Sequence, residues 1–328
     1  MRFVCTLHEV APPPVRCIAA TKRRIMSDLT DPEHATSLAL GRRAFVAITA
    51  SVAALGGQVG SADAQGADFG KPHPPIVPED DGTINVSRPR VTYGDRTIDA
   101  YLAVPRNVTG PTPGIVVVQA IWGLDAQLRD VVRRYAKQGY ATIAPDLYTG
   151  LAAPSGDGAS DFAPYRDIAA KLVDATVDAD IAAAADYLRS APSGKGARVG
   201  VTGFCMGGGI TLRQAVDNKT LAAAVVFYGK VRYGTGGNAG PITPIALAYA
   251  DELTVPLAGN WGGRDTSILA ADVRALDAKL SDLRRRHDIK VYPDAGHAFF
   301  DDTRSSYVPS AATDAWTRTL IWFGQHLK

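Results

Sequence analysis

Three side chains suited to acyl transfer follow three successive predicted strands in the C-terminal half of the chain. Cys205 lies in "GFCMGGG", Asp265 in "GGRD" and His297 in "DAGHAFF". The carboxyl ends of parallel strands meet at one edge of a sheet, so these side chains are placed to converge there. In that arrangement His297 would take the proton of the Cys205 thiol, and Asp265 would hold the other imidazole nitrogen.

Each of these residues also has a plain structural interpretation. An isolated cysteine is often a small buried apolar residue. Asp265 could cap the helix that begins near Ser267, and His297 could hydrogen-bond within its loop. The glycines around Cys205 favour the catalytic interpretation, because strand, Gly203-Phe204-Cys205-Met206-Gly207 and helix form the pattern of a nucleophile elbow with cysteine in place of serine.

The elements that must position these residues alternate between strand and helix patterns. "SRPRVTYG" and "TIDAYLAVP", joined at Gly94-Asp95-Arg96, predict an antiparallel hairpin. The further predicted strands are "GIVVVQA", "YATIAPDLY", "ARVGVTG", "LAAAVVFYG", "ELTVPLAGNWG" and "HDIKVYPDAG". Helices are predicted at "LRDVVRRYAKQG", "YRDIAAKLVDATVDADIAAAADYLRS" (one long or two shorter), "GITLRQAVD", "SILAADVRALDAKLSDLRRR" and "SAATDAWTRTLIWFGQHLK". This alternation predicts an α/β fold with a doubly wound, mostly parallel sheet behind an N-terminal antiparallel hairpin.

The first 64 residues have the pattern of an export signal rather than of a folded domain. Arg42 and Arg43 precede a mostly apolar run that is too short to span a bilayer stably, and "ADA" at residues 62–64 supplies a small-x-small cleavage pattern. The paired arginines resemble a twin-arginine signal, although Gly41 stands where Ser or Thr is usual. A plain secretory signal and an uncleaved anchor are the alternatives. We expect residues 1–64 to be removed in the periplasm, residues 65–84 to be a linker and residues 85–328 to form the folded domain.

Composition excludes several classes of partner and cofactor. Of 328 residues, 46% are hydrophobic and 21% are charged, and the net charge of +2 argues against a nucleic-acid partner. Cys5 and Cys17 lie in the segment expected to be removed, which leaves Cys205 as the single cysteine and excludes an intramolecular disulfide. The sequence contains no metal-ligand spacing, phosphate-binding loop or nucleotide fingerprint. We therefore expect a cofactor-free, metal-free monomer that acts on a small molecule.

From about Arg90 to Lys328 the chain resembles the dienelactone hydrolase family of α/β-hydrolases. The resemblance is carried by "VVVQAIWGL", "GYATIAPDLY", "GFCMGGG", "GGRD" and "AGHAFF", in that order. It implies an α/β-hydrolase fold, a Cys205–His297–Asp265 triad and cleavage of an ester or lactone. By the same resemblance, the backbone N–H groups of Ile121 and Met206 would form the oxyanion hole, and an amide at the start of a helix is indeed free for such a role.

Two positions depart from the family pattern. The family usually has a glutamate that helps activate the cysteine in "Q-E-I-F-G", whereas this chain has Ala120 in "QAIWG". The enzyme that cleaves dienelactone has an arginine four residues beyond the histidine, where this chain has Asp301, so we expect an anionic lactone to be disfavoured. The missing glutamate leaves a catalytically silent binding protein as the alternative to an exported hydrolase. We expect the substrate pocket to be lined by Trp122, Tyr228, Trp261 and Arg304.

The export signal gives the first testable prediction. Replacing both Arg42 and Arg43 by Lys keeps the positive charge but removes the arginine pair, so the double variant should accumulate as a precursor in the cytoplasm. Cell fractionation and immunoblotting measure the precursor and the periplasmic protein. An equal periplasmic yield from both forms would point to the general secretory route.

Overall fold

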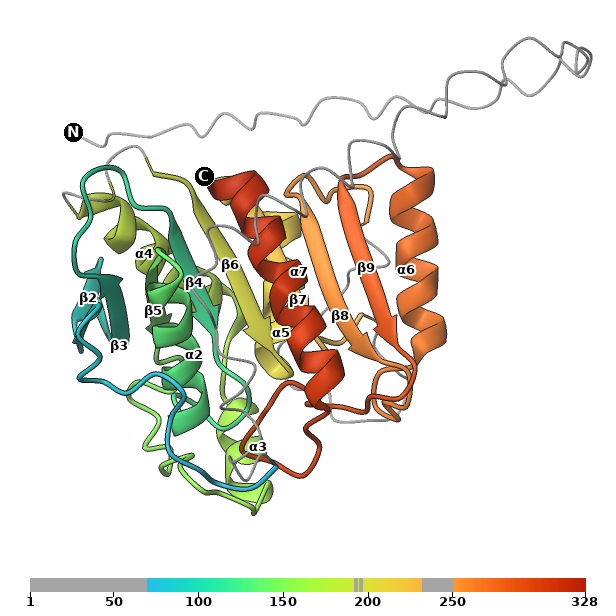
Figure 1. The fold of residues 1–328 in the computed structure, drawn as a ribbon, viewed down its shortest axis with the longest axis horizontal. Coiled ribbons are helices and arrows are strands. Elements are labelled where there is room, and N and C mark those ends of the chain that lie inside the picture. Colours follow the sequence, from blue (N-terminus) through green and yellow to red (C-terminus); the bar gives the residue numbers. More distant parts are fainter. Residues whose placement is uncertain (1–69, 192–193, 195–196, 232–249) are drawn as a thin grey trace, which may run out of the picture. The chain divides into compact units, whose positions relative to one another are not determined.

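The structure is a computed structural model that describes residues 70–191, 194, 197–231 and 250–328 (Figure 1). These residues belong to one compact unit, Gly66–Lys328. The predicted export signal, the first residues of the predicted linker and most of the loop that follows Tyr228 lie outside the described residues.

A mixed sheet forms the centre of the described unit. Its strands are β1 (Ile84–Ser87), β2 (Arg90–Tyr93), β3 (Arg96–Pro105), β4 (Gly114–Val118), β5 (Ala141–Pro145), β6 (Val199–Phe204), β7 (Ala223–Phe227), β8 (Leu257–Gly262) and β9 (His287–Tyr292). They are ordered β1-β3-β5-β4-β6-β7-β8-β9, with β2 paired to β3. β3 is antiparallel to β1, β2 and β5, and all pairs from β5 to β9 are parallel. The predicted hairpin and the doubly wound, mostly parallel sheet are therefore confirmed.

Helices cover both faces of this sheet, and this explains the continuous apolar runs of its central strands. The helices are α2 (Ala126–Lys137), α3 (Ala163–Ala169), α4 (Asp174–Ser190), α5 (Met206–Asp217), α6 (Ala270–Asp282) and α7 (Pro309–Leu327). In Figure 1, α2 and α7 lie in front of the sheet, and α4 and α5 lie behind it. Every residue of β4, β5, β6 and β7 is consequently buried. The segment predicted as one long or two shorter helices forms two, α3 and α4.

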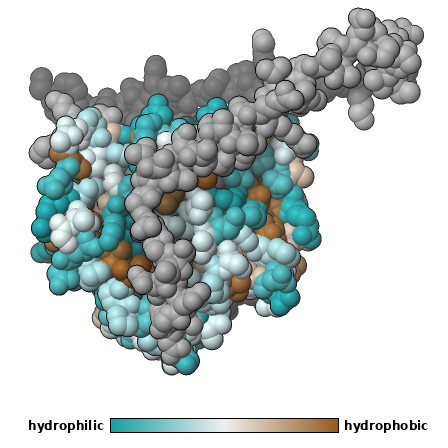
Figure 2. All heavy atoms as spheres, viewed as in Figure 1, coloured by the Kyte–Doolittle hydropathy of each residue, from teal (hydrophilic) through white to brown (hydrophobic). Residues whose placement is uncertain are grey.

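One face of the described unit shows a surface of mixed polarity. On the face shown in Figure 2, hydrophobic residues occur in small groups among hydrophilic ones. None of the helices in the described residues combines the length and the apolar character that crossing a bilayer requires.

The second half of the segment predicted as a linker packs against the domain. Residues 70–83 contain no helix or strand, as expected, and Ile84 already belongs to β1. The Asp130 carboxylate, on α2, accepts hydrogen bonds from Ile76 N at 2.9 Å and Val77 N at 2.8 Å. Val77 is 4% exposed and contributes to the core. A segment rich in Pro and Gly looks like a linker in sequence, but here its backbone is held by a buried carboxylate.

Replacing Asp130 by Asn should destabilise the domain substantially. The carboxylate is 2% exposed and also pairs with Arg134, at 2.5 Å from Nη2. In the variant, the Arg134 guanidinium loses a buried charged partner. The amide NH2 group that replaces one carboxylate oxygen is a donor and cannot accept the hydrogen bond from a backbone N–H. The free energy of unfolding should therefore fall by about 3 kcal/mol. Urea denaturation measures the loss.

Asp99→Asn is the matched control for that measurement. Asp99 and Arg90 also form an ion pair, at 3.5 Å, but their side chains are 63% and 73% exposed. Solvent screens such a pair, so the control should lose less than about 1 kcal/mol. Equal losses in the two variants would show that Asp130 does not hold residues 76 and 77 in place.

Candidate active site

The site is built around a sharp turn between β6 and α5. Cys205 has φ 55° and ψ −113°, a conformation that side-chain-bearing residues rarely adopt. A Cβ on Gly203 would lie 2.3 Å from Gly207 O, and a Cβ on Gly207 would lie 2.4 Å from Val118 O. The glycines that frame Cys205 in the sequence are thus required for the turn to close.

His297 and Asp265 meet beside this turn. Their side chains are joined by a bond of 2.7 Å between His297 Nδ1 and Asp265 Oδ2. The other Asp265 oxygen accepts hydrogen bonds from the backbone N–H groups of Ser267 at 2.8 Å and Ile268 at 3.0 Å. Asp265 therefore holds both the histidine and the loop that precedes α6, so the two interpretations of this residue are compatible.

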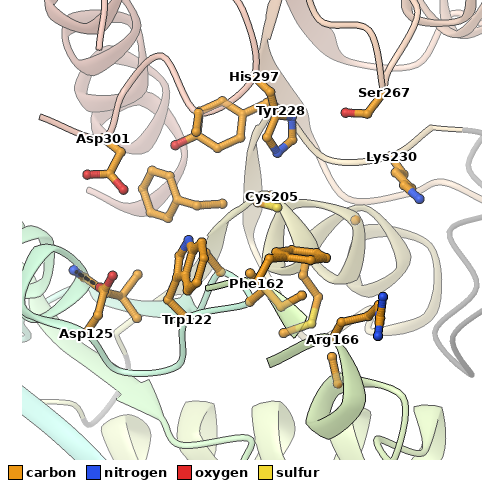
Figure 3. A pocket seen from close by; sticks show the side chains of 18 of the residues that line it. Trp122, Asp125, Phe162, Arg166, Cys205, Tyr228, Lys230, Ser267, His297 and Asp301 are labelled. Atoms are coloured by element: carbon orange, nitrogen blue, oxygen red, sulfur yellow. Dashed lines mark hydrogen bonds between the residues drawn. The ribbon is translucent and has the colours of Figure 1, made fainter. Parts of the chain in front are cut away.

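The imidazole of His297 points toward Cys205 (Figure 3). Burial raises the pKa of the Cys205 thiol, but the hydrogen bond and charge of His297, together with the backbone N–H of Met206, outweigh it and hold this pKa below its usual range. Burial lowers the pKa of His297, yet its hydrogen bonds to Asp265 and Cys205 and their charges raise it to about 10. The two groups therefore shift each other toward the thiolate and the imidazolium, against the effect of burial.

Two backbone amides predicted for an oxyanion hole lie at this site. Met206 is the first residue of α5, and its N–H already stabilises the Cys205 thiolate. Ile121 follows β4 and is 8% exposed, and its carbonyl accepts a hydrogen bond of 2.8 Å from the Tyr148 hydroxyl. The same hydroxyl lies 3.9 Å from Met206 Sδ. Tyr148, which the sequence analysis did not single out, thus contacts both residues; its place just after β5, beside β4 in the sheet, is the signal that could have found it.

A cavity of about 660 Å³ opens over Cys205. Apolar and aromatic side chains make up most of its wall: Ile121, Trp122, Leu128, Phe162, Phe204, Met206, Tyr228 and Ile268. Charged groups lie at two ends, with Asp125 and Asp301 on one side of Cys205 and Arg166 and Lys230 on the other (Figure 3). Such a cavity suits a small, largely apolar molecule with a few polar groups.

Of the four predicted pocket residues, Trp122, Tyr228 and Arg304 line this cavity and Trp261 does not. Trp261 is 0% exposed, and its indole Nε1 donates a 2.7 Å hydrogen bond to Gly229 O. Its ring lies so close to Gly259 that a Cβ there would be 2.0 Å from the indole. The prediction for Trp261 is wrong because this side chain packs into the core beside its own strand.

Asp301 and Arg304 interact with each other in the cavity wall. Arg304 Nε donates to Asp301 Oδ2 at 3.0 Å, and the guanidinium stacks 4.1 Å from the centre of the Trp122 ring. The charge of Asp301 is therefore balanced locally. Ala120 also lines the cavity, so its methyl group stands where the family glutamate is expected.

Fold and elbow together define an α/β-hydrolase, and comparison with known proteins gives the family. The sequence profile of the Dienelactone hydrolase family matches residues 98–327, and the chain belongs to this family.

Known relatives agree with this assignment. The chain is 37% identical over 256 residues to a protein of Salmonella typhimurium named "Putative carboxymethylenebutenolidase", covering 77% of this chain and 92% of that protein. A protein of the same name from Escherichia coli K12 is 39% identical over 238 residues, 72% of this chain and 84% of the other. A crystal structure described as "Putative Dienelactone Hydrolase" from Klebsiella pneumoniae matches with a TM-score of 0.67 and 35% identity, over 74% of this chain and 99% of that one. The protein is therefore a hydrolase of esters or lactones.

The lowered pKa of Cys205 gives a prediction about alkylation. An ordinary thiol with a pKa near 8.5 loses roughly a hundredfold in alkylation rate between about pH 8 and pH 6, because little thiolate remains. Cys205 should lose far less with iodoacetamide, since its pKa is held below the usual range by His297. His297→Ala should slow the reaction near pH 6 by about tenfold or more. If the variant keeps the wild-type pH profile, His297 does not ionise the thiol.

Proposed function

We propose that this protein is a periplasmic cysteine hydrolase that cleaves small esters or lactones through a thioester at Cys205. The observation that carries the proposal is the 2.7 Å bond between His297 and Asp265 beside a cysteine held in a strained elbow. That arrangement gives an activated nucleophile, a base and a group that orients the base.

In the first half of the reaction the Cys205 thiolate attacks the carbonyl carbon of the substrate. Negative charge moves to the carbonyl oxygen, where the N–H groups of Met206 and Ile121 would stabilise it by donating hydrogen bonds. The tetrahedral intermediate collapses, the C–O bond to the alcohol breaks, and the His297 imidazolium gives its proton to the departing alkoxide. Asp265 keeps the imidazole in the orientation that this transfer needs.

In the second half, water replaces the alcohol. Neutral His297 takes a proton from a water molecule, whose oxygen attacks the thioester carbon. Collapse of the second intermediate breaks the C–S bond and releases the carboxylic acid product. Cys205 returns to a thiolate beside protonated His297, so the resting pair is restored.

The missing glutamate does not remove the means of activation. Ala120 has no acceptor for a thiol proton, but the pKa values of Cys205 and His297 already favour the ion pair in the absence of substrate. This supports a working hydrolase over a silent binding protein, because a binding protein has no use for the alignment of Cys205, His297 and Asp265.

Export is the second part of the proposal. It is motivated by Arg42, Arg43 and the cleavage pattern at residues 62–64. After cleavage, Cys205 would be the single thiol of the mature protein, so it would have no partner for a disulfide within the chain in an oxidising compartment.

Turnover of a panel of p-nitrophenyl esters and small lactones tests the proposed chemistry. Cys205→Ala and Asp265→Asn should each lower kcat by several orders of magnitude, because the triad works as a unit. Asp294→Asn is the matched control, since the Asp294 side chain is 78% exposed and pairs with Arg264 on the surface. Substantial turnover by Cys205→Ala would show that another group is the nucleophile.

A further inference from the structure

Asp125 is a cavity residue with an acceptor that the fold leaves unused. It is 7% exposed, and its Oδ1 accepts the Leu128 N–H at 2.9 Å to cap α2. Within the described parts of the chain, the Asp125 carboxyl has no other hydrogen bond or ion pair. Asp125 lines the cavity and its Oδ2 is accessible from it, so a bound ligand can supply a hydrogen-bond partner to this oxygen.

The neighbouring groups are already occupied. Asp301 Oδ1 accepts from the Thr303 hydroxyl at 2.6 Å and its Oδ2 accepts from Arg304. Asp157 pairs with Arg129 at 2.9 Å. Asp125 is therefore the carboxyl at this end of the cavity whose acceptor is free.

The charge state of Asp125 limits what it can recognise. Burial raises the pKa of Asp125 to about 7; the Leu128 N–H and Arg304 oppose the shift, and Asp301 and Asp157 add to it. Below neutral pH the group is a neutral acid that repels no anion, and above it a carboxylate that does. A hydroxyl suits both states, because it can donate to the carboxylate and accept from the O–H of the protonated acid.

We propose that Asp125 is a specificity-determining residue that selects esters or lactones carrying a hydroxyl group on the arm that lies along Trp122. The inference rests on the proposed role of Cys205, which fixes where the reacting carbonyl lies. In Figure 3, Trp122 lies between Cys205 and Asp125. A substituent on a substrate whose carbonyl lies at the Cys205 thiol would thus pass Trp122 before it reaches the Asp125 carboxyl.

Alkylation of Cys205 tests this without turnover. The probes are N-alkyl iodoacetamides whose alkyl chains have the same length and end in methyl, hydroxyl, carboxylate or ammonium. The terminal group lies in the cavity while the thiolate displaces iodide. Each rate is divided by that of the methyl reagent on the same protein. Wild type should prefer the hydroxyl arm about tenfold, the effect of one hydrogen bond, at acid and alkaline pH alike.

Two substitutions remove different parts of the interaction. Asp125→Ser keeps an N-cap oxygen for α2 but has no second oxygen, so the hydroxyl preference should disappear. Asp125→Asn also keeps the cap and cannot ionise. In wild type, the alkylation rate of the carboxylate reagent relative to the methyl reagent should fall between about pH 6 and pH 8, because Asp125 ionises. In Asp125→Asn this ratio should not fall. Asp157→Asn, which removes a nearby exposed carboxylate, should keep the hydroxyl preference.

The outcomes separate this inference from the proposed function. A hydroxyl preference that persists in Asp125→Ser, or a preference for the carboxylate or ammonium arm over the hydroxyl arm in wild type, overturns the role of Asp125. Slow alkylation of wild-type Cys205 by every reagent contradicts the activated nucleophile instead. The ratio of hydroxyl to methyl rates still reports on Asp125 in that case.

Discussion

The turn at Cys205 is the constraint on which the site depends. Holding a cysteine at φ 55° costs about 1–3 kcal/mol, which the surrounding sheet and helix must offset. The turn requires the backbone at positions 203 and 207 to approach other backbone atoms closely. Only glycine permits this, because any Cβ at Gly203 or Gly207 would overlap those atoms. The same approach brings the end of β4 against the start of α5, since the atom that a Gly207 Cβ would meet is Val118 O. The strained turn and the position of the Met206 N–H beside the thiol are thus consequences of one packing arrangement.

The electrostatics of the site depend on the same closeness. Burial by itself would keep both Cys205 and His297 neutral, since it raises the pKa of the thiol and lowers that of the imidazole. Their mutual hydrogen bond and the bond from His297 to Asp265 reverse both effects. A carboxylate beside the thiol would oppose its ionisation, so Ala120 in place of the family glutamate is compatible with the lowered pKa of Cys205.

The sequence predicted those features that local patterns determine. Alternating strands and helices, the hairpin and the glycine-framed elbow each rest on a few consecutive residues. Trp261 was predicted wrongly because the side that a tryptophan faces at a strand end depends on what the neighbouring strands leave open. Tyr148 and Asp125 were missed because their partners, Ile121 and the cavity, come from other parts of the fold. Composition predicts a linker at residues 65–84, because it does not show that the distant Asp130 carboxylate binds the backbone of residues 76 and 77.

The Asp130 carboxylate belongs to a network of contacts that runs from residues 70–83 toward the wall of the active site. Arg134 pairs with Asp130, which binds residues 76 and 77, and with Asp302 at 2.6 Å, whose carbonyl accepts the Gly70 N–H at 2.8 Å. Asp302 adjoins Asp301, which binds Arg304 at the Trp122 end of the cavity. Buried charges are stable only when each has its partner, so replacing Asp130 or Asp302 would leave Arg134 with one buried partner fewer. The segment ahead of the first strand is therefore bound both to α2 and to the loop that precedes α7, and it lies outside the family resemblance, which begins near Arg90.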